Sequence, residues 1–279
     1  MMVAMKSLLE EAQKRKYAIG SFNVYNYETI RGVIDAASDE RVPVIVAFGE
    51  RYLENMGLAE VASVTRDLCA GAGVPVVLHL DHCKSFDHIV QAVQAGFTSV
   101  MYDGSSLPYE ENAATTHEVT RLAHAAGVSV EAELGAIGLG DRSNEEEASQ
   151  IYTDPGQARD FVSRTGIDAL AVSIGTVHGL YKGEPKINID ILKEICRIVQ
   201  IPLVLHGGSG TPEEIIRQCI QNGICKINVN TEISAHVVDK LRELLCSGAD
   251  HHLSQLSVKQ VSLVKDVVKK YIRIFGGVA

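Results

Sequence analysis

Eight short runs of β-branched and aliphatic residues recur along this chain of 279 residues, and segments with helical periodicity separate them. Strands that alternate with helices pair in parallel, and eight such units in a chain of this length favour a closed barrel. We therefore predict an α/β chain folded as a (β/α)8 TIM barrel. The runs occupy 17–23, 42–48, 74–80, 98–103, 129–134, 169–174, 202–206 and 224–229, and the predicted helices occupy 29–40, 58–70, 86–94, 111–125, 156–164, 189–199 and 212–221.

An open doubly wound sheet is the alternative architecture, but no G-x-G-x-x-G pattern follows the first run. Residues 232–279 add two amphipathic helices, at 233–246 and 258–274, whose apolar stripes exceed what eight barrel units need. We expect residues 1–279 to form a single domain. Its C-terminal helical extension packs on the barrel or against a second subunit.

The charge of the chain restricts its partners. A formal net charge of −9 and a pI near 5.6 argue against nucleic acid and against an anionic membrane surface. An anionic ligand must therefore be held by local features. The first 17 residues lack a secretory pattern, and no apolar run reaches membrane-spanning length. The six cysteines show no C-x-x-C pairing, which favours reduced thiols and a cytoplasmic location.

Three histidines follow three different runs: His82 in LHLDH, His178 in IGTVHG and His206 in LHGGSG. The carboxyl ends of barrel strands meet at one face, so these histidines are expected to converge. A single histidine is more often a satisfied polar residue than a ligand. Three imidazoles at one face, however, can bind a divalent metal ion and leave a position open for substrate. We interpret them as metal ligands.

Carboxylates occupy the same predicted face. Asp81 directly precedes His82, where it would act as an acid or base beside the substrate, or orient an imidazole as its hydrogen-bond partner. Glu133 ends the fifth run and would bind a second metal position or hold an imidazole. Glu131 precedes Glu133 by two residues, so its side chain should point to the same face of the strand but lie deeper in the barrel. We rank Glu131 lower than Glu133 as a site residue.

A phosphate cradle is predicted after the last two runs, where GGSG and NVNT follow the strands. Glycines let backbone N–H groups approach phosphate oxygens, and a helix N-terminus adds partial positive charge. A metal ion beside such a cradle suits chemistry at a carbonyl next to a phosphorylated carbon, such as aldol cleavage or ketose isomerisation. The substrate-binding positions we assign are Asn23, Gly179, Gly207, Gly208, Ser209, Asn228, Val229, Asn230 and Thr231.

A long segment, 135–150, follows the fifth run and is first glycine-rich and then acidic. A loop of this length beside a site is typical of a lid. A solvated surface loop is the alternative, and it suits the acidic half, 145–147, better than the glycine-rich half.

Together, these motifs resemble those of the class II, metal-dependent ketose-bisphosphate aldolases of the fructose- and tagatose-bisphosphate branch. The similarity runs through SFNVYNYE, VVLHLDHC, EENAATT, VEAELG, IGTVHGLYKGEP, LVLHGGSG and KINVNTE. It implies that His82, His178 and His206 bind one zinc ion, with Co2+, Fe2+ or Mn2+ as substitutes, and that Glu133 takes part in metal binding. It also implies a possible monovalent cation and a homodimer or homotetramer.

The resemblance further implies cleavage of a ketose 1,6-bisphosphate, with fructose 1,6-bisphosphate first. The alternatives are the tagatose epimer and a related class II aldolase that releases a non-phosphorylated or modified aldehyde. The products would be dihydroxyacetone phosphate, held by the cradle, and an aldehyde such as glyceraldehyde 3-phosphate. Asp81 would donate a proton on the aldehyde side. In the family a loop acid moves the second proton. Asp141 occupies the position of that acid in this chain, and Glu145 or Glu146 are alternatives. The family's serine-containing turn is replaced by 48–51, which leaves Arg51 as a candidate for the far phosphate.

Three other functions remain to be distinguished. Lys226 would form a Schiff base in a metal-independent aldolase, or it is a barrel-interior lysine paired with a carboxylate. A sugar-phosphate-binding subunit without activity would have lost its metal. A metal-dependent isomerase or epimerase would give different products.

Overall fold

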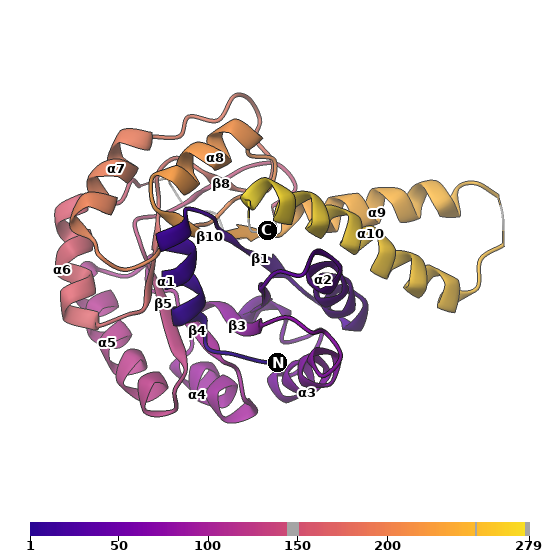
Figure 1. Cartoon of the computed structure of the whole chain (residues 1–279), viewed down its shortest axis with the longest axis horizontal. Coiled ribbons are helices and arrows are strands. Elements are labelled where there is room, and N and C mark those ends of the chain that lie inside the picture. Colours follow the sequence, from indigo (N-terminus) through magenta and orange to yellow (C-terminus); the bar gives the residue numbers. More distant parts are fainter. Residues whose placement is uncertain (144–150, 249, 277–279) are drawn as a thin grey trace.

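The structure is a computed structural model that describes residues 1–143, 151–248 and 250–276. Within these residues, eight parallel strands close into a barrel in the order β1-β10-β9-β7-β5-β4-β3-β2 (Figure 1). The predicted TIM barrel is confirmed, and each predicted run overlaps one barrel strand. The strands are β1 (Ile19–Asn23), β2 (Val44–Gly49), β3 (Val76–Cys83), β4 (Ser99–Tyr102), β5 (Ser129–Leu134), β7 (Ala169–Val172), β9 (Leu203–Leu205) and β10 (Ile224–Val229).

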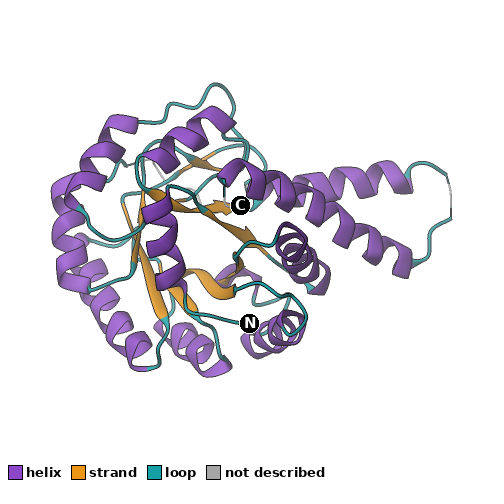
Figure 2. Cartoon of the chain, viewed as in Figure 1, coloured by secondary structure: helices purple, strands orange, loops and turns teal. Residues whose placement is uncertain are grey.

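Helices surround the barrel on the outside, as Figure 2 shows. Their starts follow local sequence signals: the Asn26 side chain caps the first helix after β1, and Asp154 caps a helix whose first residue is Pro155. The connecting helices are α2 (Tyr27–Glu40), α3 (Leu58–Cys69), α4 (Phe86–Ala95), α5 (Tyr109–Ala125), α6 (Pro155–Thr165), α7 (Ile189–Ile198) and α8 (Glu213–Gln221), and a short 3-10 turn, η1 (Glu50–Tyr52), follows β2.

An additional helix that the sequence patterns did not reveal, α1 (Met5–Arg15), covers one end of the barrel. Its buried face consists of Met5, Leu9 and Ala12, which pack against residues near the amino ends of the strands, among them Ile19 and Val77. Figure 1 shows α1 lying across the barrel opening. The amino ends are therefore covered, and the cavities described below lie at the carboxyl ends.

The C-terminal extension forms α9 (Thr231–Leu245) and α10 (Leu253–Phe275), which run side by side away from the barrel in Figure 1. The second half of α10 packs on α2, where Gly32 leaves room for Val264: a Cβ on Gly32 would lie 2.7 Å from the Val264 Cβ. Arg273 and Glu40 form an ion pair of 2.7 Å at the same contact. The extension thus packs on the barrel through α10. Its contact with a second subunit stays a prediction.

None of the helices in the described residues combines the length and apolar character that crossing a bilayer requires.

Glu232 joins the two C-terminal helices to the loop after β9. Its carboxylate accepts hydrogen bonds from Lys270 Nζ and from the Tyr271 hydroxyl, each at 2.5 Å, and from the Gly210 N–H at 3.3 Å. Burial alone would raise the pKa of Glu232, but these hydrogen bonds outweigh burial and lower it. The ionised carboxylate therefore stabilises the docking of α10.

We expect Glu232→Gln to lower stability by about 1–2 kcal/mol near neutral pH, because it weakens charge-assisted bonds that solvent partly screens. The pKa of Glu232 is lower in the folded state than in the unfolded state. Its stabilisation is therefore fully present above the unfolded-state pKa of about 4.3 and is lost as the pH falls through the folded-state pKa. Thermal unfolding at about pH 7 and about pH 4 should therefore show a smaller difference at the lower pH. The control Glu194→Gln, exposed on α7, should leave the stability unchanged at both pH values. A stability difference between Glu232→Gln and the wild type that does not depend on pH would contradict the ionic role of Glu232.

Candidate active site

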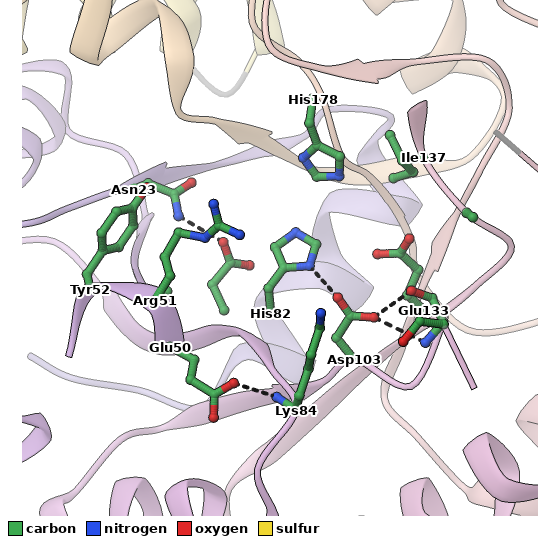
Figure 3. Close-up of a pocket in the computed structure, with 15 residues that line it drawn as sticks. Asn23, Glu50, Arg51, Tyr52, His82, Lys84, Asp103, Glu133, Ile137 and His178 are labelled. Carbon is green, nitrogen blue, oxygen red and sulfur yellow. Dashed lines mark hydrogen bonds and ion pairs between the residues drawn. The ribbon is translucent and has the colours of Figure 1, made fainter. Parts of the chain in front are cut away.

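The three predicted histidines lie together at the carboxyl ends of the strands (Figure 3 shows His82 and His178). Each offers one ring nitrogen, and these three atoms lie within 4.8 Å of one another. The ring centroid of His82 is 5.2 Å from that of His178 and 4.5 Å from that of His206. The geometry suits a shared metal ion with imidazole ligands.

Carboxylates fix the orientation of two of these rings. His82 Nδ1 is 2.8 Å from Asp103 Oδ2, and His206 Nε2 is 3.0 Å from Glu131 Oε1. The opposite nitrogens, His82 Nε2 and His206 Nδ1, face each other at 2.8 Å. Carboxylate partners of this kind are usual behind metal-binding imidazoles, because they set the tautomer and increase the basicity of the ring.

Burial and the nearby His82 lower the pKa of both His178 and His206, and that of His178 falls well below its usual value. Both rings are therefore neutral near physiological pH, the state in which imidazole binds metals. The donor set fits a divalent ion.

A bulge in β3 brings Asp81 and His82 to the same cavity. The register between β3 and β4 shifts between Leu80 and Cys83, and His82 adopts a φ of 46°, which is unusual for a residue other than glycine. In a regular strand, neighbouring side chains would point to opposite faces. Cys83 does turn away, since its thiol contacts Glu50 Oε1 and the Ser85 carbonyl, both at 3.3 Å.

Asp81 is almost fully buried, and two amides hold it. Asn23 Nδ2 donates to its Oδ2 at 2.8 Å and Asn228 Nδ2 donates to its Oδ1 at 3.1 Å. Burial raises the pKa of Asp81, but its electrostatic interactions with His82 and Lys226 outweigh burial and lower it. The carboxylate is therefore ionised and fixed in orientation beside the three imidazoles.

A narrow cavity on one side of Asp81 is lined by most of the predicted phosphate cradle. Its lining includes seven of the nine predicted substrate-binding residues, Asn23, Gly179, Gly207, Ser209, Asn228, Asn230 and Thr231. The two others do not line it. The Gly208 N–H is donated to the Asn228 carbonyl at 2.9 Å, and the side chain of Val229 is fully buried in the barrel wall.

Backbone geometry explains two of the cradle glycines. Gly207 has a φ of 71°, and a Cβ there would lie 2.3 Å from the Val177 carbonyl oxygen. Gly179 has a φ of 110°, and a Cβ there would lie 2.6 Å from the Asp141 carbonyl oxygen. Thr231 is the first residue of α9, so the positive end of that helix adjoins the cradle.

The segment after β5 is attached to the His178 segment. The short strands β6 (Gly138–Leu139) and β8 (Val177–His178) pair in parallel, with Leu139 opposite His178. Asp141 follows, but its side chain is 59% exposed, is 3.3 Å from Lys182 Nζ and lines neither active-site cavity. The alternative acids Glu145 and Glu146 lie outside the described residues.

Glu133 is buried beside Asp103 and His82, and the three form a second group of donor atoms within 4.8 Å of one another. Burial and the charge of Asp103 raise the pKa of Glu133 well above its usual value. Its Oε2 has no hydrogen-bond partner among the described residues. A buried orphan oxygen next to an imidazole fits an additional or displaced metal position.

Lys226 is fully buried, its Nζ is 2.8 Å from Glu131 Oε2, and it lines neither cavity. Lys226 therefore pairs with a carboxylate in the barrel interior, which is the alternative to a Schiff-base role for this lysine. The importance of Glu131, ranked low from the sequence, comes from its contacts with both Lys226 and His206.

A second, larger cavity of about 240 Å³ lies on the other side of the histidines. It shares Asn23, Asp81, His82 and His178 with the narrow cavity. It extends to residues that the sequence patterns did not reveal, Tyr52, Lys84, Ser105, Ser106 and Ile137. Arg51, a sequence candidate, lines it as well. The missed residues lie in loops beyond the strand ends, where no local pattern marks them.

Comparison with known proteins identifies the family. Residues 3–278 match the sequence profile described as fructose-bisphosphate aldolase class-II. The chain belongs to the class II fructose-bisphosphate aldolase family. The predicted family is thereby confirmed, as is the reaction class, because these aldolases are lyases.

Three curated relatives have different named substrates. The D-tagatose-1,6-bisphosphate aldolase subunit GatY of Klebsiella oxytoca is 41% identical over 98% of this chain and 97% of its own. The fructose-bisphosphate aldolase of Geobacillus stearothermophilus is 45% identical over 88% and 86%. The 6-phospho-5-dehydro-2-deoxy-D-gluconate aldolase of Bacillus licheniformis is 42% identical over 98% and 94%. Family membership therefore leaves the substrate open.

Replacing Asp103 by Asn should weaken metal binding by about 10- to 100-fold, because the partner that orients and polarises His82 is lost. The measurement is competitive zinc titration against a chelating dye, with folding checked by circular dichroism. Asp67→Asn, an exposed site on α3, serves as the control. Equal zinc affinity of the Asp103 variant and the wild type would contradict the assignment of His82 as a ligand.

Replacing Lys226 by Met should destabilise the protein by about 3–5 kcal/mol, because Glu131 would be left as a buried charge without its cation. Thermal unfolding would reveal this loss, and the additional change Glu131→Gln should recover part of it. The exposed control Lys193→Met should leave the unfolding temperature unchanged. An unaltered Lys226→Met protein would mean that the pair does not hold the barrel interior.

Proposed function

We propose that this protein catalyses the reversible, metal-dependent aldol cleavage of a ketose 1,6-bisphosphate to dihydroxyacetone phosphate and an aldehyde. Fructose 1,6-bisphosphate, which gives glyceraldehyde 3-phosphate, is the first candidate, and tagatose 1,6-bisphosphate is the second. The observation that carries the proposal is the shared wall of the two cavities. Asp81, His82 and His178 line both the narrow cavity, which also contains Gly179, Gly207 and Ser209, and the larger cavity.

In this proposal His82, His178 and His206 hold zinc, with Glu133 at an additional position. The bound ion would polarise the substrate ketone and stabilise the charge that develops when the C3–C4 bond breaks. Co2+, Fe2+ or Mn2+ would suit the same ligands.

The ionised state of Asp81 suits the cleavage direction. Its carboxylate accepts the proton of the C4 hydroxyl while the C3–C4 bond breaks and the C4 carbonyl forms. Asn23 and Asn228 hold both carboxylate oxygens and so keep them aimed at this proton. Condensation reverses the transfer, and Asp81 then acts as the donor.

The electron pair left on C3 requires a second proton, which we assign to an acid of the segment after β5. Asp141 is the first candidate, with Glu145 or Glu146 as alternatives. The pairing of β6 with β8 supports this proposal, because it links that segment to His178. Gly179, Gly207, Ser209, Asn230 and Thr231 would hold the phosphate of the dihydroxyacetone half.

The names of the relatives bear on the aldehyde half. One relative is named for a 1,6-bisphosphate, one for fructose bisphosphate, and the third for a phosphorylated gluconate, which carries a carboxylate. We include in the proposal a cytoplasmic location, supported by six free cysteines, and a homodimer or homotetramer, supported by exposed Val238, Leu245 and Leu253 on the extension.

The first experiment is cleavage of fructose 1,6-bisphosphate and tagatose 1,6-bisphosphate, side by side, with and without EDTA and with zinc added back. We expect EDTA to abolish cleavage and zinc to restore it, with fructose 1,6-bisphosphate cleaved faster. Borohydride with substrate should leave the activity intact, because no Schiff base forms at Lys226.

Each other outcome has a meaning. Activity that survives EDTA and is trapped by borohydride would favour the Schiff-base alternative. Isomerised rather than cleaved product would indicate an isomerase or epimerase. A zinc-loaded protein that transforms neither bisphosphate would overturn the bisphosphate assignment, and failure to bind any metal would favour a subunit that only binds sugar phosphates.

A further inference from the structure

A carboxylate, a thiol and an imidazole meet behind the wall of the larger cavity. They belong to Glu50, Cys83 and His88, whose donor atoms lie within 4.8 Å of one another. Glu50 begins η1, Cys83 ends β3, and His88 lies in the first turn of α4. Glu50 lines the larger cavity, but the other two do not. In Figure 3 the Glu50 carboxylate points away from His178 and toward the backbone nitrogen of Lys84. The proposed aldol chemistry uses none of the three groups.

The contacts in this cluster converge on one oxygen atom, Glu50 Oε1. It is 2.6 Å from His88 Nδ1, 3.3 Å from Cys83 Sγ and 3.2 Å from the Ser85 backbone nitrogen. A carboxylate oxygen accepts along about two lone-pair directions, so three donors exceed what it can accept well. The single thiol hydrogen also faces two oxygens at 3.3 Å, Glu50 Oε1 and the Ser85 carbonyl. Hydrogen bonds alone therefore account for this arrangement incompletely.

The donor set suits a cation of the zinc type. Thiolate, imidazole and carboxylate are the ligands that zinc takes in proteins, whereas Mg2+ and Ca2+ prefer oxygen alone. Tetrahedral zinc bonds of about 2.0–2.3 Å separate neighbouring donor atoms by about 3.3–3.8 Å. The 3.3 Å between Cys83 Sγ and Glu50 Oε1 matches this separation. His88 Nδ1 lies closer to Glu50, but the His88 side chain is 35% exposed, so its ring has room to move back.

Burial and backbone contacts hold the other two groups in place. Cys83 is fully buried, and its thiol contacts the Ser85 carbonyl, which can supply a fourth donor. The Glu50 side chain is only 18% exposed, and it accepts hydrogen bonds from the Lys84 and Ser85 N–H groups at 2.9 and 3.2 Å. These two bonds fix the carboxylate independently of the thiol and the imidazole.

We propose that Glu50, Cys83 and His88 bind a second divalent cation of the zinc type, separate from the ion at the three histidines. On binding, the thiol releases its proton to solvent. The His88 ring keeps its hydrogen on Nε2, so that Nδ1 faces the ion. The ion joins the turn after β2, the end of β3 and the start of α4. This inference does not depend on the proposed aldol cleavage.

Titration with Co2+ distinguishes the two sites, because a thiolate ligand gives a charge-transfer band in the near ultraviolet. Imidazole and carboxylate ligands, the only types assigned to the histidine site, give no such band. The full chain is freed of metal with a chelator, kept reduced and titrated. We expect the wild type to develop the band with the intensity of one thiolate per chain. Cys83→Ser should abolish the band, and the exposed control Cys246→Ser should leave it unchanged.

Two histidine variants test the other parts of the proposal. His88→Gln should raise the Co2+ concentration needed for the band by at least about 10-fold, since even a lost partner of a metal ligand costs that much. The control His117→Gln, exposed on α5, should leave this concentration unchanged. His178→Ala removes a ligand of the histidine site and should retain the band. If Cys83→Ser does not fold, His88→Gln and its control decide.

Several results would overturn the second site. One is the absence of the charge-transfer band at saturating Co2+, and another is a band that persists in Cys83→Ser. An unchanged Co2+ requirement in His88→Gln would exclude the three-ligand set. Loss of the band in His178→Ala would mean that the thiol serves the histidine site, so that no separate site exists. Cleavage activity enters none of these measurements, so failure of the aldolase proposal would be seen separately.

Discussion

A continuous set of buried polar contacts at the barrel centre supports the whole site. Lys226 pairs with Glu131, Glu131 contacts His206, and His206 faces His82, whose other nitrogen is held by Asp103. Buried charges are costly unless each has a partner, so this arrangement tolerates few alternatives. These contacts fix the orientation of the His82 and His206 imidazoles.

Local backbone irregularity completes this arrangement. The bulge in β3 turns Asp81 and His82 toward one cavity and sends Cys83 to the other face. The glycines at 179 and 207 allow the loops after β8 and β9 to pass close to neighbouring carbonyl groups. Regular strands would supply these side chains but would not aim them together, so the site depends on departures from regular structure.

Much of this could be predicted from residue patterns. The eight runs overlap the eight barrel strands, and the strand-end rule brought His82, His178 and His206 to one face. Helix α1 was missed because it precedes the first strand and so lies outside the strand–helix alternation that placed the other helices, although Met5, Leu9 and Ala12 have helical spacing. The part played by Glu131 was underestimated, since parity alone does not reveal which partners a buried carboxylate meets.

The sequence by itself determined the order of strands, the residues at their carboxyl ends and the family, because periodicity and short motifs are properties of neighbouring residues. Only the tertiary structure decided which side chains meet across the barrel. Asp103 behind His82, Asn23 on Asp81, and Arg51 with Lys84 around one cavity join residues from different strands and loops. Strand stagger, a bulge and loop closure set these distances, and none of the three leaves a pattern in the linear chain.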